Sequence, residues 1–109
     1  MAKDDYFVIA YRLLKYLYDC LKKGQTVSGE ILTPEFFGIG EEYWAYIIRN
    51  LYQDGYVEGV SLTRIGRKPD YPSIQEHFNI TPKGIQYIQD NSVFEKIRGY
   101  VKDISSMIP

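Results

Sequence analysis

The stretch EEYWAYIIRNLYQDGYVEG, Glu41 to Gly59, predicts a helix that stops at a turn and continues directly into a strand. Its apolar residues recur at three- and four-residue spacing, which places them on one helical face that should pack against the core. These residues are Trp44, Ile47, Ile48 and Leu51. Gly55 ends the helix, because glycine adopts the left-handed conformation that many helix exits require. The function therefore depends on what the opposite face contacts.

That opposite face carries polar and aromatic side chains that can contact DNA. Arginine suits guanine, asparagine and glutamine suit adenine, and tyrosine hydroxyls can bond to phosphates. The residues on this face are Tyr43, Tyr46, Arg49, Asn50 and Gln53. Against DNA binding, Glu41, Glu42 and Asp54 outweigh Arg49, so that residues 40–54 carry a net charge of −2. The first two acids have another explanation, since carboxylates in a first helical turn stabilise a helix by about 0.3–1 kcal/mol.

Two helices are expected before this one. Residues 4–23 predict an amphipathic helix that ends at Gly24, and Thr33 with Pro34 gives the cap and first-turn proline of a second helix. Gly38 and Gly40 limit that second helix to one or two turns. The inward face of the first helix is expected to contain Phe7, Ala10, Leu13, Leu14, Leu17 and Leu21.

The segment after Gly55 predicts a β-hairpin. Residues 56–63 are rich in β-forming residues, with Gly59 as a bulge, and EHFNI at 76–80 can pair back on them with Phe78 and Ile80 inward. The residues between, RIGRKPDYPSIQ at 64–75, contain two prolines and predict a polar loop. This loop is expected to project from the domain as a wing.

Two more helices are expected at the end of the chain. Thr81 and Pro82 repeat the cap-and-proline pattern before a helix with Ile85 and Ile88 inward. SVFE at 92–95 matches a capping box, and it begins a last amphipathic helix with Phe94, Ile97, Val101 and Ile104 on one face. This helix either packs on the first helix or forms a dimer contact, so that monomer and homodimer are both open. The dimer contact would use Tyr100, Ile104, Met107 and Ile108.

The order of these elements resembles the winged helix-turn-helix fold of bacterial regulators, an α+β fold with one or two C-terminal helices after the wing. More closely, the chain is similar to the YjcQ family of small bacterial and prophage proteins, on the stretches EEYWAYIIRNLYQDGYVEG and FNITPKGIQYI. The resemblance implies a compact domain of bacterial or phage origin without an established biochemical activity. A phage structural role is one possibility that the family carries.

Composition sets limits on the class of protein. The 109 residues, 45% of them hydrophobic, are enough for one domain spanning residues 1–109. A net charge of −1 provides no overall positive field, so any nucleic-acid site must be a local patch. Cys20 is the single cysteine and the first 20 residues are too charged for a membrane span, which predicts a cytoplasmic protein.

Two hypotheses of function follow from these residues. In the first, the protein is a DNA-binding regulator or accessory factor that contacts duplex DNA through the outer helix face and the wing cations Arg64, Arg67 and Lys68, with Lys22, Lys23 and Lys83 as possible additions. In the second, it is an adaptor or phage structural protein that binds a phage or host protein through Tyr43 and Tyr46.

Enzyme chemistry has little support in the sequence. His77 has no partner at metal-ligand spacing, and Cys20 lies within an apolar helix. The sequence therefore predicts no enzyme, no metal and no cofactor.

Overall fold

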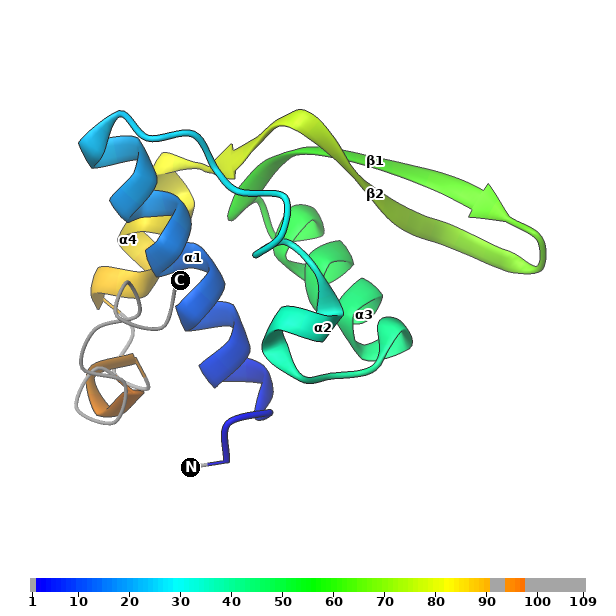
Figure 1. Ribbon diagram of the computed structural model, residues 1–109, viewed down its shortest axis with the longest axis horizontal. Helices are drawn as coiled ribbons and strands as arrows, with labels where there is room; N and C mark the ends of the chain where they lie inside the picture. Colours follow the sequence, from blue (N-terminus) through cyan, green and yellow to red (C-terminus); the bar gives the residue numbers. More distant parts are fainter. Residues whose placement is uncertain (1, 91–93, 98–109) are drawn as a thin grey trace.

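A computed structural model describes residues 2–90 and 94–97 (Figure 1). The elements follow the order α1 (Tyr6–Lys23), α2 (Pro34–Phe37), α3 (Glu41–Gln53), β1 (Val57–Ile65), β2 (Lys68–Ile80) and α4 (Pro82–Asp90). The fold is therefore α+β, with three helices followed by a two-stranded antiparallel hairpin and further helix. The expected order of elements is confirmed over the described residues.

Helix α1 forms the centre of the core. Its middle turns are buried on several sides, and they contact α3, β2 and α4. Because residues on several sides of α1 are buried, apolar residues at three- and four-residue spacing are not the only ones that face the core. Four of the six residues expected inward are buried, namely Ala10, Leu13, Leu14 and Leu17. The prediction was wrong for Phe7 and Leu21, which lie in the terminal turns of α1 and are 42% and 50% exposed.

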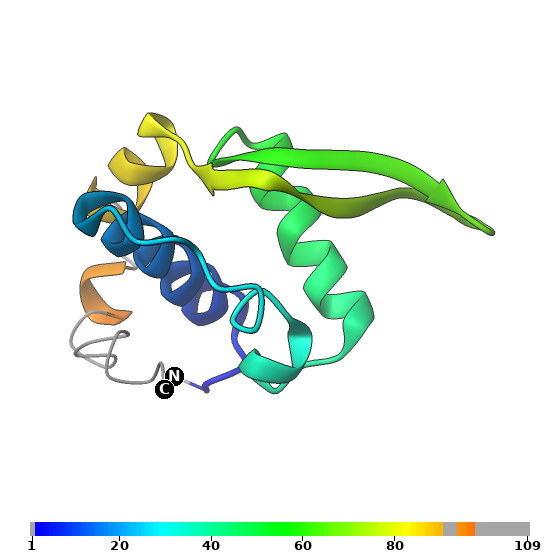
Figure 2. The same cartoon turned by 45° about the horizontal axis from the view of Figure 1, so that its top comes forward.

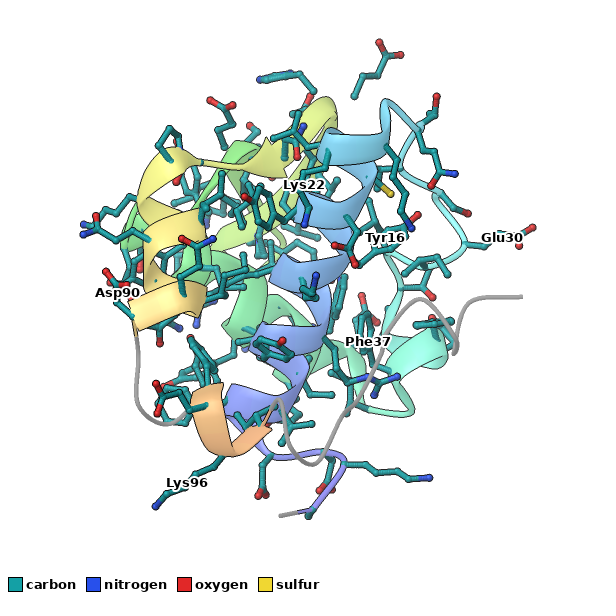
Figure 3. The ribbon with its side chains drawn as sticks, turned by 90° about the vertical axis from the view of Figure 1, so that its left-hand side faces the viewer. Tyr16, Lys22, Glu30, Phe37, Asp90 and Lys96 are labelled. Atoms are coloured by element: carbon teal, nitrogen blue, oxygen red, sulfur yellow. The ribbon has the colours of Figure 1, made fainter. Side chains whose placement is uncertain are left out.

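The chain leaves α1 through Gly24, which adopts the expected left-handed conformation with φ of 66°. The segment that follows is fixed to α1 because the Ser28 N–H donates to the Tyr16 hydroxyl at 2.8 Å (Figure 3). Helix α2 is one turn long and begins as predicted, with the Phe36 N–H donating to Thr33 Oγ1 at 3.2 Å. Phe37 is buried, and its ring stacks on Trp44 at 5.5 Å between centroids.

The hairpin is longer than the sequence predicted. Strand β1 runs to Ile65 and β2 starts at Lys68, so that Gly66 and Arg67 alone form the turn. The prediction of a loop over residues 64–75 was therefore wrong. In a two-stranded ribbon each strand has one edge without a partner, where Pro69 and Pro72 need no ladder hydrogen bond.

The pairing of the strands is irregular at Gly59, as expected, but the extra residues lie on β2. Val60 pairs with Ile74 and Glu58 with Asn79, so that Gly59 alone faces the four residues Gln75 to Phe78. Its φ of +81° lies in the left-handed region. The outer part of the hairpin extends past α3 in two views of the molecule (Figures 1 and 2).

The base of the hairpin is joined to α4 through Thr81. Its hydroxyl donates to the Gly55 carbonyl at 2.6 Å and accepts from the Gly84 N–H at 3.0 Å. Residues 94–97 form a helical turn in which Phe94 and Ile97 are fully buried. The expected capping box at Ser92, and the expected apolar face and dimer contact beyond residue 97, lie outside the described residues.

Candidate nucleic-acid interface on α3 and the hairpin

The inner face of α3 is the one that the sequence predicted. Trp44, Ile47, Ile48 and Leu51 are all buried in the core. Gly55 follows the helix with φ of +84°, and the chain turns there into β1. The opposite face of α3 is therefore directed away from the core.

Tyr43 differs from the expectation that it lies on the open face. It is half-buried, and its hydroxyl donates to the Asp4 backbone carbonyl at 2.7 Å, just before α1. The pKa of Tyr43 is raised above its ordinary value, mainly because the side chain is partly buried. The residue ties the start of α3 to the start of α1, so its hydroxyl is already occupied.

Tyr46 lies on the open face and is 50% exposed. Its ring makes an edge contact with Tyr6 at 6.1 Å, and the Arg49 guanidinium lies 5.8 Å from the ring centroid. Asn50 donates its side-chain amide to the Tyr46 carbonyl at 2.7 Å, which commits one of its donors to the helix backbone. Gln53 is exposed in the last turn.

The acidic start of α3 is contacted by side chains from the hairpin. The Lys68 ammonium forms an ion pair and hydrogen bond with Glu42, and the Tyr71 hydroxyl donates to Glu41 Oε1 at 2.6 Å. The bond to Glu42 raises the pKa of Lys68, and the bond to Glu41 raises the pKa of Tyr71 to about 12. These contacts could not be predicted from the sequence, because their partners are 26 and 30 residues apart.

A groove of about 420 Å³ lies between α3 and the outer hairpin. Neither Arg49 nor Arg67 forms an ion pair within the described part of the chain, whereas Lys68 is held by Glu42. Three cations and two carboxylates give the lining a net charge of +1. The lining residues are Glu42, Ala45, Arg49, Arg67, Lys68, Pro69, Asp70 and Tyr71.

The other predicted cations lie elsewhere. Arg64 is near the hairpin tip, where its Nε donates to the Gly66 carbonyl at 3.3 Å. Lys22, which is labelled in Figure 3, lies in the last turn of α1. Its ammonium is 3.6 Å from Asp19 Oδ1, and the Lys83 ammonium lies 5.5 Å from the centroid of the Tyr56 ring. The end of α1 and the start of α4 are at the opposite end of the molecule from the hairpin tip (Figures 1 and 2). The expected addition of Lys22, Lys23 and Lys83 to the wing patch was therefore wrong.

Metal-ligating residues do not gather in the described ranges 2–90 and 94–97, where no group of three or more His, Cys, Asp or Glu side chains could hold an ion. Cys20 is buried and His77 is exposed on β2. No helix in the same ranges is long and apolar enough to cross a membrane.

The fold and groove define a small α+β protein in which a projecting hairpin contacts the start of a surface helix. The model of the YjcQ protein family matches residues 11–107. The chain therefore belongs to the YjcQ family. Comparison with curated proteins and with solved structures gave no match.

Proposed function

We propose that the protein is a winged-helix protein that binds the backbone of duplex DNA, as a regulator or accessory factor in the cytoplasm. In this arrangement α2 and α3 form the helix-turn-helix and the hairpin is the wing. No enzymatic step is part of the proposal. The observation that carries it is the groove in which Arg49 of α3 and Arg67 of the hairpin lie together, without an ion-pair partner in the described residues.

The charged residues that line the groove support phosphate contact more than base reading. Arginine binds phosphate through several N–H donors, and phosphate contacts carry most non-specific affinity. Glu42 would oppose a phosphate if it were free, but Lys68 neutralises it. Base contacts would fall to Arg49, Gln53 and the partly committed Asn50.

The test is fluorescence anisotropy with a labelled random duplex over a series of salt concentrations. Binding at low salt that weakens as salt rises is expected, and Arg49→Met or Arg67→Met should each reduce the slope of log K against log salt by about 0.9. Lys23→Met is the matched control, because it removes the same charge from the far end of α1 and should leave the slope unchanged. Absence of binding by the wild type at the lowest salt would refute the proposal.

A second candidate function is an adaptor or phage structural protein that binds another protein. The observation in its favour is a continuous aromatic surface, in which Tyr6 contacts both Phe7 at 5.2 Å and Tyr46 at 6.1 Å. Phe7 and Tyr46 are 42% and 50% exposed, and exposed aromatic residues are enriched where proteins bind one another. Tyr43 contributes less than expected, since its hydroxyl is already bonded to Asp4.

Affinity purification from the native host tests this second candidate. A discrete protein that is captured by the wild type and lost with Tyr46→Ala would support it. Tyr52→Ala is the matched control, because Tyr52 is an exposed tyrosine on the same helix outside this aromatic surface. Equal capture by both variants would remove the surface from consideration.

A further inference from the structure

The ion pair between Lys68 and Glu42 occupies the groove where the DNA backbone is proposed to bind. Its side chains are 52% and 73% exposed, and water competes with both charges, so that an exposed pair of this kind contributes little stability. Phosphate oxygens, like carboxylate oxygens, are anionic acceptors that form charge-assisted hydrogen bonds with ammonium groups. A phosphate entering the groove can therefore replace Glu42 as the partner of Lys68.

The neighbouring residues place the phosphate close enough for this exchange. Arg49 and Arg67 line the same groove as the ion pair and have no ion-pair partner in the described residues. A phosphate bound to either arginine would occupy the groove that Lys68 also lines, and Glu42 lines it as well. While Glu42 keeps its charge, the exchange breaks one ion pair and leaves a carboxylate facing the DNA.

On the basis of the proposed function, we propose that Glu42 is an internal competitor for the DNA backbone. In the free protein Glu42 holds Lys68, and in the complex a phosphodiester oxygen takes the ammonium while Glu42 loses its ion-pair partner. No bond is made or broken other than these hydrogen bonds, and the charges balance because one anion replaces another. Glu42 therefore weakens the contact that Lys68 makes with DNA.

The experiment is a double-mutant cycle in the anisotropy assay with the same random duplex. Glu42→Gln should tighten binding by about three- to five-fold. This gain corresponds to the upper part of the range of free energies that exposed ion pairs contribute, because the variant no longer competes for Lys68. With Lys68→Met already present, the same change should tighten binding less than two-fold, since the coupling is lost. Thermal unfolding of each variant checks that the fold is intact.

Glu41→Gln is the matched control. It removes an equal charge one residue away, where the hydrogen-bond partner is the Tyr71 hydroxyl rather than a cation, and it should change affinity less than two-fold. Equal gains from the changes at Glu41 and Glu42, or a gain from Glu42→Gln that persists beside Lys68→Met, would show simple repulsion and overturn the inference. Wild-type binding with no gain from Glu42→Gln would overturn this inference alone, whereas no binding by any variant would overturn the proposed function as well.

Discussion

Gly59 allows the two strands of the hairpin to approach each other at the bulge, and its replacement by alanine tests this geometry. Its φ is +81°, where an alanine side chain costs about 1–2 kcal/mol. An added Cβ would also lie 2.5 Å from the Phe78 backbone nitrogen and 2.6 Å from the Phe78 Cα. Backbone atoms cannot move aside as a flexible side chain can, and forced repacking costs about 1–3 kcal/mol more. Gly59→Ala should therefore reduce the free energy of unfolding by about 2–5 kcal/mol.

Urea unfolding followed by tryptophan fluorescence measures this change, since Trp44 is buried in the core. Gly66→Ala is the matched control, because Gly66 has a φ of +60° but nothing within 4 Å of an added Cβ. It should cost only the backbone part, about 1–2 kcal/mol. If Gly59→Ala were no more destabilising than Gly66→Ala, the close approach of the strands at the bulge would be refuted.

Three further predictions concern the core, a helix cap and a tyrosine. Ile47→Ala removes a fully buried side chain from α3 and should cost about 2–5 kcal/mol in urea unfolding. Thr81→Ala removes the cap of α4 and its bond to the Gly55 carbonyl, and should cost about 0.5–2 kcal/mol, whereas Thr81→Ser should retain most of the stability. The folded pKa of Tyr71 is about 12 against an ordinary value of 10.0, so the unfolded chain loses this proton first. Stability should be intact below pH 10 and fall between pH 10 and about 12, and Tyr71→Phe should make that fall shallower in urea titrations at fixed pH.

The sequence predicted the elements whose signals are local. Helix α3 was found because its apolar spacing, its first residues and Gly55 all indicate the same helix. The caps at Thr33 and Thr81 were found for the same reason, since each depends on neighbours within a few residues.

The outer hairpin and the ends of α1 could not be predicted in this way. The two prolines in residues 64–75 are typical of a loop, but in the fold they occupy a ribbon whose strands have free edges. Phe7 and Leu21 fit the apolar spacing of α1, but their exposure depends on where neighbouring elements end. Tyr43 likewise fits the open face of α3, and it is half-buried because the start of α1 lies beside it.

The net charge of the candidate site could not be predicted from the sequence of α3 alone. Residues 40–54 carry a net charge of −2, whereas the groove lining that includes the hairpin carries +1. Electrostatic interactions depend on distance in space, so the second value is the one that a phosphate meets. The cations Arg49, Arg67 and Lys68 are still few.

Three cations limit how strongly a single copy of the protein can bind DNA. Three phosphate contacts give a slope of about −2.7 in log K against log salt, which corresponds to a loss of roughly forty-fold between 50 and 200 mM salt. A monomer that uses only this groove would therefore bind weakly at physiological salt. A measured slope near −2.7 would indicate one groove per complex, whereas a slope near twice that value would require a second copy or a second basic surface on the DNA. Titrations of DNA with protein at each salt concentration separate a second copy from a second basic surface. Only the recruitment of a second copy makes the titration curve cooperative, and therefore steeper in protein concentration.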